Sequence, residues 1–246
     1  GVLREVFEHV PDDLDFVFGE PVTGSGVRAE LDGAFFAGDL VFGTPHFAEP
    51  AVAEFAFEEP TAQPGDVVAD VGAHHGLYSV AAAKRIAPGR IFAFEPDPEN
   101  FAILQKNVQG MNVRCFQGAV SSTRGFANVI DTGQGHWAFR TEASAGSGDV
   151  PMVTINDIYE EEGKGTFYPF LVKMDIEGAE RHAIAGAHET ILHFRPRMAI
   201  CVYHLQDDPK VIRASVAAIE KRYQVGTGCL LVPPSTTAEV QHFRPN

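Results

Sequence analysis

The sequence has few of the residues that mark several large classes of protein. It has three cysteines, Cys115, Cys201 and Cys229, and no CxxC pair. This argues against a zinc knuckle or a disulfide framework and fits a reducing cytosol. The apolar runs are short, and Met198 to Tyr203 is among the longest, far below the roughly 18 residues of a membrane span. No basic segment precedes an apolar one at the start, so we expect a secretory signal to be absent or removed, and we predict a cytoplasmic protein with no membrane partner.

Basic residues are also scarce. The chain has 19 Lys and Arg against 33 Asp and Glu, which gives a formal charge of −14 and a pI near 5.1. Proteins that bind nucleic acids need clustered Lys and Arg to neutralise phosphates, so we predict no nucleic-acid partner.

The acidity is concentrated in residues 1–60, which hold 13 acidic and only two basic residues. The same segment holds nine of the 19 phenylalanines, so it is unlike a disordered acidic tail. Val27 to Phe36 has the pattern of a hairpin around Asp32-Gly33, and Ala51 to Glu59 that of a short helix ended by Pro60. We predict a small β-rich appendage over 1–48, which covers the substrate or contacts another copy in a possible homo-oligomer, and a catalytic domain over 49–246.

From Gly65 onward, predicted strands and helices alternate. The predicted strands are 66–70, 90–95, 112–116, 170–175 and 198–204, with further extended segments at 126–130 and 137–140 and a terminal antiparallel pair at 225–232 and 238–243. The predicted helices are 77–87, one that begins at Asp97-Pro98 and ends near Gly110, 179–192, and one that begins at Asp208-Pro209 and runs to about Arg222. Repeated strand–helix units predict a mostly parallel sheet that binds ligands at the carboxyl ends of its strands.

The first chemical signal is the turn Asp70-Val71-Gly72-Ala73-His74-His75-Gly76, which follows the first strand. Glycines let a ligand approach the backbone. A dinucleotide fingerprint needs glycine at 72, 74 and 77, where this chain has Gly, His and Leu, which weakens an NAD interpretation. The second signal is Glu95, at the end of the next strand, where an acid can accept the ribose hydroxyls of an adenosyl ligand. The structural alternatives are an ordinary strand–helix turn for the first signal and a solvated strand-end carboxylate for the second.

The third signal is the stretch Leu171 to Glu180, LVKMDIEGAE. Its strand brings Asp175 to the carboxyl edge of the sheet, and Glu177 lies in the turn that follows. Glu180 begins the next helix, where a carboxylate is also stabilised by the helix N-terminus, so a structural role and a role near the substrate are equally open for it.

Three stretches in this order, 70–79, 94–108 and 171–180, resemble the FkbM family of S-adenosylmethionine-dependent methyltransferases. The resemblance implies an α/β, Rossmann-like class I methyltransferase fold: a seven-stranded, mostly parallel sheet whose last strand is antiparallel. It also implies methylation of a hydroxyl on a sugar or natural-product acceptor. One departure is His74, where the family usually has Asn.

By this resemblance, Asp70, Gly72 and Gly76 hold the methionine end of S-adenosylmethionine and Glu95 holds the ribose. The segment that follows the third strand lies where such folds place the adenine. The full predicted cofactor site is Asp70, Gly72, Ala73, His74, Gly76, Glu95, Pro96, Gln117, Gly118, Ala119 and Asp175.

A hydroxyl acceptor loses its proton during transfer, so a base within hydrogen-bond reach is expected. Asp175 is the first candidate, and His204 and His136 are the others. Glu177 is expected near the substrate. Asp175, Glu177 and His204 also have the ligand types of a divalent-metal site, a possibility that no spacing motif favours.

Three other functions stay open from the sequence. An NAD-dependent oxidoreductase fits the fold class and Glu95 but not the glycine spacing. An N-methyltransferase differs only in its acceptor. A cofactor-binding protein without catalytic activity is the third, because intact motifs do not prove turnover.

Overall fold

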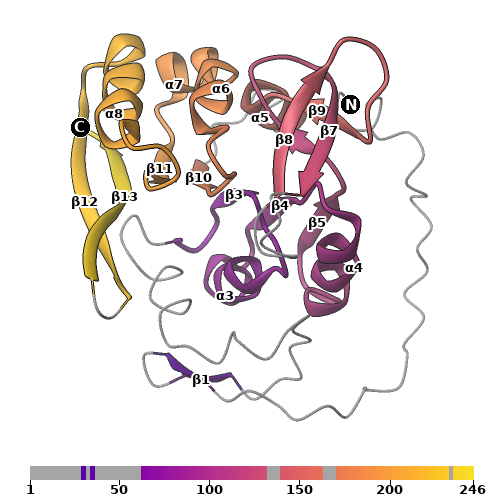
Figure 1. The fold of residues 1–246 in the computed structure, drawn as a ribbon. Helices are drawn as coiled ribbons and strands as arrows, with labels where there is room; N and C mark the ends of the chain where they lie inside the picture. Colours follow the sequence, from indigo (N-terminus) through magenta and orange to yellow (C-terminus); the bar gives the residue numbers. More distant parts are fainter. Residues whose placement is uncertain (1–28, 32–33, 37–61, 132–138, 163–169, 233–234) are drawn as a thin grey trace.

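The computed structural model describes residues 29–31, 34–36, 62–131, 139–162, 170–232 and 235–246. Its main element is a seven-stranded sheet with the order β12-β13-β11-β10-β3-β4-β5 (Figure 1). The strands are β3 (Val67–Val71), β4 (Arg90–Phe94), β5 (Val113–Phe116), β10 (Phe170–Met174), β11 (Arg197–Cys201), β12 (Tyr223–Val232) and β13 (Ser235–Pro245).

The strand directions confirm the predicted sheet. Each neighbouring pair from β11 through β10, β3 and β4 to β5 is parallel. The last strand, β13, is antiparallel to both of its neighbours, β11 and β12. Because β4 and β5 lie on one side of β3 and β10 lies on the other, the chain changes direction across the sheet between β3 and β10. Open α/β sheets bind ligands beside the carboxyl ends of such a strand pair.

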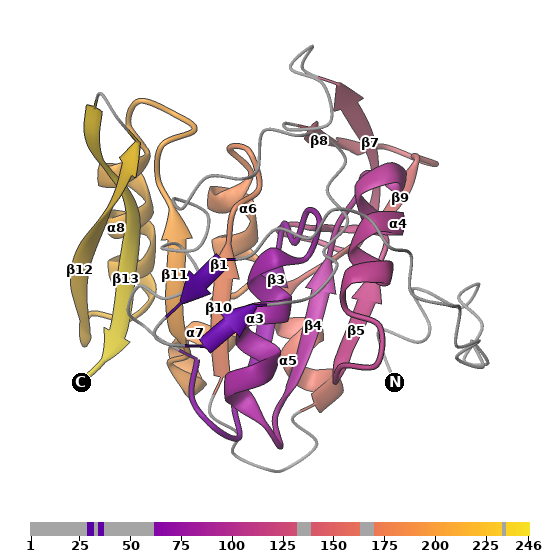
Figure 2. The same ribbon diagram turned by 90° about the horizontal axis from the view of Figure 1, so that it is seen from below.

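Helices cover both faces of this sheet (Figures 1 and 2). They are α3 (Leu77–Ile86), α4 (Pro98–Asn107), α5 (Ile155–Glu162), α6 (Glu180–Ala185), α7 (His188–Phe194) and α8 (Asp208–Ile219). One buried cluster packs α3 and α4 against one face, and a second packs α5 to α8 against the other. All five residues of β3 and of β10 are buried, as expected for central parallel strands covered on both faces.

A second, four-stranded sheet follows β5, with the order β6-β9-β7-β8. Its strands are β6 (Ala119–Val120), β7 (Gly125–Asp131), β8 (Phe139–Ser144) and β9 (Val150–Val153). The structure confirms the extended segments that we predicted near 126–130 and 137–140. The sequence did not indicate that β6 and β9 join them, nor that α5 follows.

The predicted helix over 179–192 is wrong as a single element, because the structure divides it into α6 and α7. The break falls at Gly186, where an added Cβ would overlap the Ser121 carbonyl oxygen. The Gly186 carbonyl also accepts a hydrogen bond from Asn156 N. The fifth strand is also shorter than predicted: β11 ends at Cys201, so His204 lies beyond the strand.

The predicted hairpin is present as β1 (Ala29–Leu31) paired antiparallel with β2 (Ala34–Phe36). The predicted helix over 51–59 and the domain boundary at 48 lie outside the described residues, so both stay predictions. Among the described residues, no helix combines the length and the apolar character needed to span a bilayer.

Candidate functional site

The turn after β3 has three left-handed residues and packs directly on the end of β10. The φ angles are 79° at Gly72, 50° at His74 and 81° at Gly76. A Cβ on Gly72 would overlap the carbonyl oxygen of Asp175, and one on Gly76 would lie 2.5 Å from Leu104 Cδ1. The amides of Gly72 and Ala73 both donate to Phe94 O at the end of β4. The two glycines therefore let the turn lie close against both neighbouring elements.

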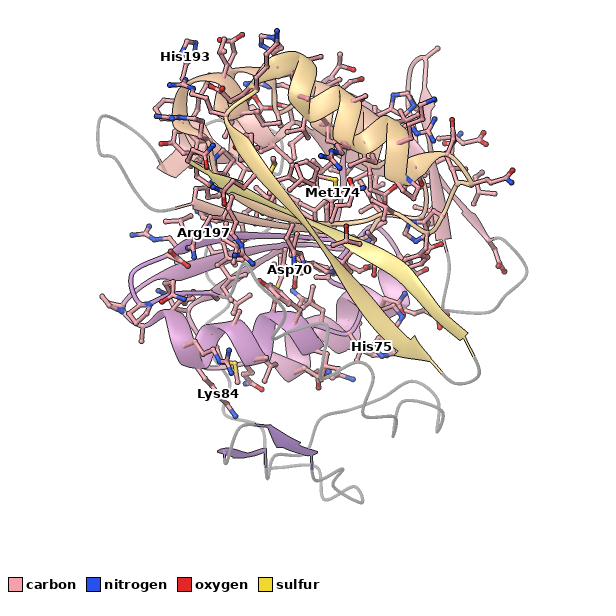
Figure 3. All side chains as sticks on the ribbon, turned by 90° about the vertical axis from the view of Figure 1, so that its left-hand side faces the viewer. Asp70, His75, Lys84, Met174, His193 and Arg197 are labelled. Carbon is pink, nitrogen blue, oxygen red and sulfur yellow. The ribbon has the colours of Figure 1, made fainter. Side chains whose placement is uncertain are left out.

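Asp70 lies beneath this turn and is fully buried. Its carboxylate is 3.1 Å from Lys173 Nζ and accepts a hydrogen bond of 2.7 Å from Ser79 Oγ. Lys173 also donates to Gly72 O at 2.6 Å, so it ties β3, β10 and the turn together. Burial acts to lower the pKa of Lys173, but Asp70 and Asp175 outweigh it and hold this pKa above its usual value. Asp70 is thus a buried support of the turn, and Figure 3 shows it in the interior, between helix layers whose outer sides carry Lys84 and His193.

Lys173 was not among the predicted site residues. A charged residue inside the otherwise apolar run of β10 was the sequence signal for it, because a buried lysine needs an acidic partner.

Glu95 lies at the end of β4 and is 5% exposed. One carboxylate oxygen accepts from His74 N at 2.8 Å and the other from Asp97 N at 3.0 Å. Burial raises the pKa of Glu95 to about 7, against the lowering effect of the two backbone amides. A carboxylate has about four lone-pair positions, so two remain for the hydroxyls of a ribose, and the residue fits its predicted role.

Asp175 follows β10, on the other side of the turn. Its side chain is 29% exposed, and its amide donates to Val71 O at 3.0 Å. The carboxylate oxygen Oδ1 accepts from Tyr203 Oη at 3.0 Å and lies 3.3 Å from His204 Nε2. Partial burial acts to raise the pKa of Asp175, but His204, Lys173 and Tyr203 outweigh it and lower this pKa to about 2.

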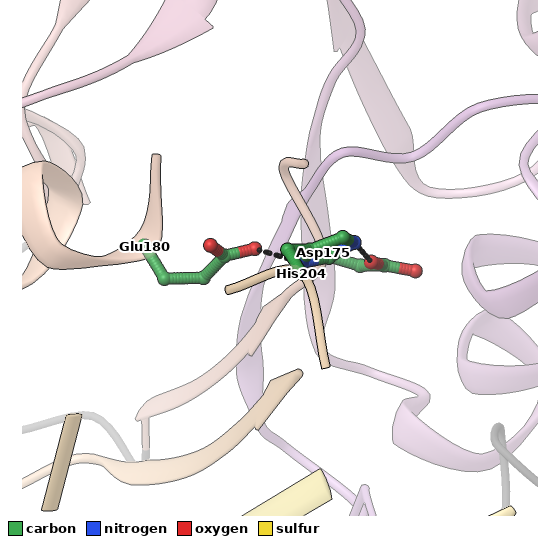
Figure 4. A group of neighbouring side chains, drawn as sticks. All are labelled: Asp175, Glu180 and His204. Carbon is green, nitrogen blue, oxygen red and sulfur yellow. Dashed lines mark ion pairs between the residues drawn. The ribbon is translucent and has the colours of Figure 1, made fainter. Parts of the chain in front are cut away.

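His204 lies between carboxylates on both sides of its ring (Figure 4). Its Nδ1 is 3.0 Å from Glu180 Oε1, and its Nε2 is 3.3 Å from Asp175 Oδ1 and 3.5 Å from Glu177 Oε1. None of these contacts has the alignment of a good hydrogen bond, so they are ion pairs. Burial acts to lower the pKa of His204, but the three carboxylates raise it to about 12. His204 is therefore an imidazolium at neutral pH and has no free nitrogen with which to accept a proton.

Glu180 is fully buried at the start of α6, where its Oε1 accepts from Ile176 N at 2.9 Å. It stabilises the turn and pairs with His204, so the structural role is present. Asp175, Glu180 and His204 offer ligand atoms within 4.8 Å of one another. The imidazole separates the two carboxylates and faces each with a different nitrogen (Figure 4). A metal would displace these ion pairs, and this is a reason not to favour one there.

The remaining predicted residues lie at the same edge of the sheet or outside the described part. Glu95 N donates to Phe116 O at the end of β5, which brings Gln117 beside Glu95. Gly118 and Ala119 are buried, and Ala119 begins β6 and pairs with Met152. Pro96 is half-buried next to Glu95. His136 falls outside the described residues and stays a prediction.

Tyr203 was not predicted. It is 46% exposed, its hydroxyl binds Asp175, and its ring centroid is 4.2 Å from that of His204. No local pattern could have identified it, because a tyrosine near the end of a strand usually belongs to the core.

The site thus combines a close-packed glycine turn, a buried strand-end acid and an oriented carboxylate, all at one edge of the sheet. Such an arrangement can hold a nucleoside ligand across β3 and β4 and place a hydrogen-bond acceptor, Asp175, beside its reactive end. Cys115 and Cys201 are poor nucleophiles, because burial raises the pKa of both thiols.

Comparison with solved structures supports the fold. A methyltransferase FkbM from Methylobacillus flagellatus is 20% identical with a TM-score of 0.53, over 74% of this chain and 44% of that chain. This chain therefore spans less than half the length of that relative, and the likeness concerns the fold.

A fibrillarin from Aeropyrum pernix with bound S-adenosylmethionine is 13% identical with a TM-score of 0.45, over 78% of this chain and 72% of that one. A precorrin-6y methyltransferase from Geobacter metallireducens is 14% identical with a TM-score of 0.44, over 74% and 79%. Neither likeness is strong enough to carry a structural argument.

No curated protein matches the sequence. The family model described as the methyltransferase FkbM domain, by contrast, matches residues 70–223. These residues include the glycine turn, Glu95, Asp175 and His204. With the seven-stranded sheet and its antiparallel last strand, the chain has the class I methyltransferase fold and belongs to the FkbM methyltransferase family.

Proposed function

We propose that the protein transfers a methyl group from S-adenosylmethionine to a hydroxyl of a small molecule, most simply a sugar or a natural product that carries one. The observation that carries this proposal is the position of the Asp175 carboxylate. It lies at the carboxyl end of β10, against the glycine turn that follows β3, and Tyr203 and His204 orient it through one oxygen.

Bound S-adenosylmethionine supplies an electrophilic methyl on a sulfonium, so the protein mainly aligns the acceptor and excludes water. Gly72 to Gly76 provide the close backbone approach for the methionine end, and Glu95 has two lone-pair positions for the ribose. Asp175 accepts the acceptor's hydroxyl proton. The protein's own residues are thus assigned to binding, orientation and one proton transfer.

The low pKa of Asp175 supports a hydroxyl over an alkylamine acceptor. A hydroxyl becomes strongly acidic only as its oxygen bonds to the methyl carbon, and a weakly basic carboxylate is then sufficient. An alkylammonium has a pKa of about 10 and must lose a proton before it can attack. A carboxylate whose pKa is about 2 is a poor base for that step, and His204 is already protonated.

The test is a screen with methyl-labelled S-adenosylmethionine against glycosides, macrolides and alkylamines, scored by label in the acceptor. We expect label in a hydroxyl-bearing compound, and loss of turnover in Asp175→Asn with little change in cofactor affinity. Calorimetry with S-adenosylmethionine and with NAD is run in parallel. Transfer to amines alone contradicts the acceptor assignment, and binding of NAD in place of S-adenosylmethionine contradicts the cofactor.

A further inference from the structure

Two exposed apolar side chains lie next to carboxylates just after β11. The exposed large apolar side chains of the described residues are Phe126, Phe194, Tyr203 and Leu205. Tyr203 is 46% and Leu205 is 41% exposed, and they flank His204. The half-buried carboxylates of Asp175 and Glu177 contact the same histidine. This edge therefore presents an apolar surface beside hydrogen-bond acceptors.

Two contacts fix the ring of Tyr203. Its hydroxyl donates to Asp175 Oδ1, and its ring is tilted by 45° against the His204 imidazole at 4.2 Å between centroids. Leu205 lies beside the turn after β10, because a Cβ on Gly178 would be 3.7 Å from Leu205 Cδ2. Leu205 therefore lies close to the 177–178 turn, and the exposed Tyr203 lies on the other side of His204 along the chain.

The hydrogen bond from the Tyr203 hydroxyl also distinguishes the two oxygens of the Asp175 carboxylate. The hydrogen bond from Tyr203 and the ion pair with His204 are both made by Oδ1, so Oδ2 takes part in neither. A tyrosine hydroxyl is neutral and a donor at physiological pH. It therefore donates a hydrogen bond to the ionised carboxylate and keeps its own proton, and it leaves the second oxygen for another donor.

We propose that Tyr203 is a positioning and specificity-determining residue for the acceptor. Its ring, with Leu205, supports the apolar C–H face of a saturated, hydroxylated ring, and its hydroxyl fixes Asp175 so that Oδ2 receives the acceptor's hydroxyl proton. The inference rests on the proposed function. A pyranose or cyclitol has both required features, an apolar ring face and hydroxyls at the rim, and an aromatic ring is a favourable surface for such a face.

Two variants separate the two roles of Tyr203. Tyr203→Phe keeps the ring and removes the hydroxyl. We expect the KM for the acceptor to stay within about 2-fold and kcat to fall about 10-fold to 100-fold, as for loss of one hydrogen bond to a charged group. Tyr203→Ala removes both, and the KM rises by about 10-fold in addition. The affinity for S-adenosylmethionine, measured by calorimetry, stays unchanged in both.

Tyr223→Phe is the matched control. It also removes a tyrosine hydroxyl hydrogen bond, of 2.9 Å to Pro196 O, at the far side of the sheet. Its kcat and KM should equal those of the unchanged protein. If Tyr203→Phe behaves like this control, the positioning role is wrong, and if Tyr203→Ala leaves the KM unchanged, the platform role is wrong.

A binding measurement keeps the inference testable without turnover. Saturation-transfer NMR titrations with methyl glycosides and inositols, in the presence of S-adenosylhomocysteine, should give similar affinities for the unchanged protein and Tyr203→Phe, and an affinity about 10-fold weaker for Tyr203→Ala. Failure of the proposed function appears as no binding of S-adenosylmethionine and no labelled product in any variant. Turnover of amines only contradicts the proposed acceptor and the Tyr203 inference with it. Failure of the Tyr203 inference alone appears as methyl transfer to a hydroxyl with no effect of either variant, or as glycoside binding that Tyr203→Ala retains at unchanged affinity. The absence of any glycoside binding to the unchanged protein also overturns it.

Discussion

Glu95 and Asp175 both carry carboxylates at strand ends, yet their surroundings shift the two pKa values in opposite directions. Glu95 meets only backbone N–H groups and is desolvated, so its pKa rises to about 7. Asp175 faces an imidazolium and a tyrosine hydroxyl, so its pKa falls to about 2 despite its partial burial. The same chemical group, a carboxylate, therefore protonates near neutral pH at position 95 and stays ionised at position 175.

The raised pKa of Glu95 has a measurable consequence for stability. Between pH 4.5 and 7, the folded protein keeps a proton on Glu95 that the unfolded chain has lost, so the stability from this residue is complete below about pH 4.5 and is lost as the pH rises through 7. We expect Glu95→Gln to remove this dependence. Its free energy of unfolding relative to the unchanged protein should increase by about 3 kcal/mol between pH 4.5 and pH 8.

Urea unfolding followed by circular dichroism at both pH values measures this difference. Comparison across pH cancels the constant effect of replacing a carboxylate oxygen by an amide. Glu99→Gln, at an exposed acid in the first turn of α4, is the control for loss of one charge. A difference for Glu95→Gln that is independent of pH contradicts the prediction.

At the scale of elements, the same Asp-Pro pair begins two helices in different ways. At α4, the side chain of Asp97 accepts from Glu99 N and Asn100 N and caps the helix at its predicted start. At α8, Asp208 is already inside the helix, and its buried carboxylate binds Arg181 and Leu205 N. The dipeptide predicts the helix start in both places, whereas tertiary partners decide what the carboxylate contacts.

The turn between β3 and α3 should be the least tolerant element of the site. Gly72→Ala places a Cβ against the Asp175 carbonyl and also strains a positive φ. Gly110→Ala has a similar φ, of 76°, and no atom within 4 Å of its Cβ. We expect Gly110→Ala to cost about 1–2 kcal/mol, the cost of left-handed backbone alone. Gly72→Ala should cost about 1–3 kcal/mol more, because of overpacking.

Urea unfolding of the two variants measures the cost, and calorimetry with S-adenosylmethionine measures the effect on binding. Gly72→Ala should also weaken cofactor binding, and Gly110→Ala should not. Equal destabilisation of both variants would mean that the turn does not depend on its close contact with β10.

At the scale of the whole molecule, the site is assembled from four strands that are far apart in sequence. Strand order brings the ends of β10, β3, β4 and β5 together at one edge, and the second sheet follows from the last of them. Ligand binding should therefore leave a discontinuous footprint in the sequence.

Hydrogen exchange with and without S-adenosylhomocysteine tests this footprint. We expect added protection of the amides at 72–76, 95–97 and 175–177, because binding suppresses local opening there. Strands β7 and β8 serve as the internal control and should exchange unchanged. Protection centred on the second sheet would place the ligand elsewhere.

Much of the fold was determined by the sequence itself. Short apolar runs that end in Asp70, Glu95 and Asp175, each followed by a turn and a helical pattern, predict parallel strand–helix units and acids at one edge. These signals depend on neighbours along the chain, and therefore they are visible without the structure. The hairpin at 29–36, the cap at Asp97 and the terminal antiparallel pair belong to the same class.

Only the tertiary structure decided which side chains meet. Lys173 pairs with Asp70 because β10 lies beside β3, and His204 lies among three carboxylates because β11 lies beside β10. Position 186, at the end of α6, requires a glycine because the Ser121 backbone lies against it. Each of these contacts joins residues brought together by strand order and packing, and local patterns along the chain do not encode such distances.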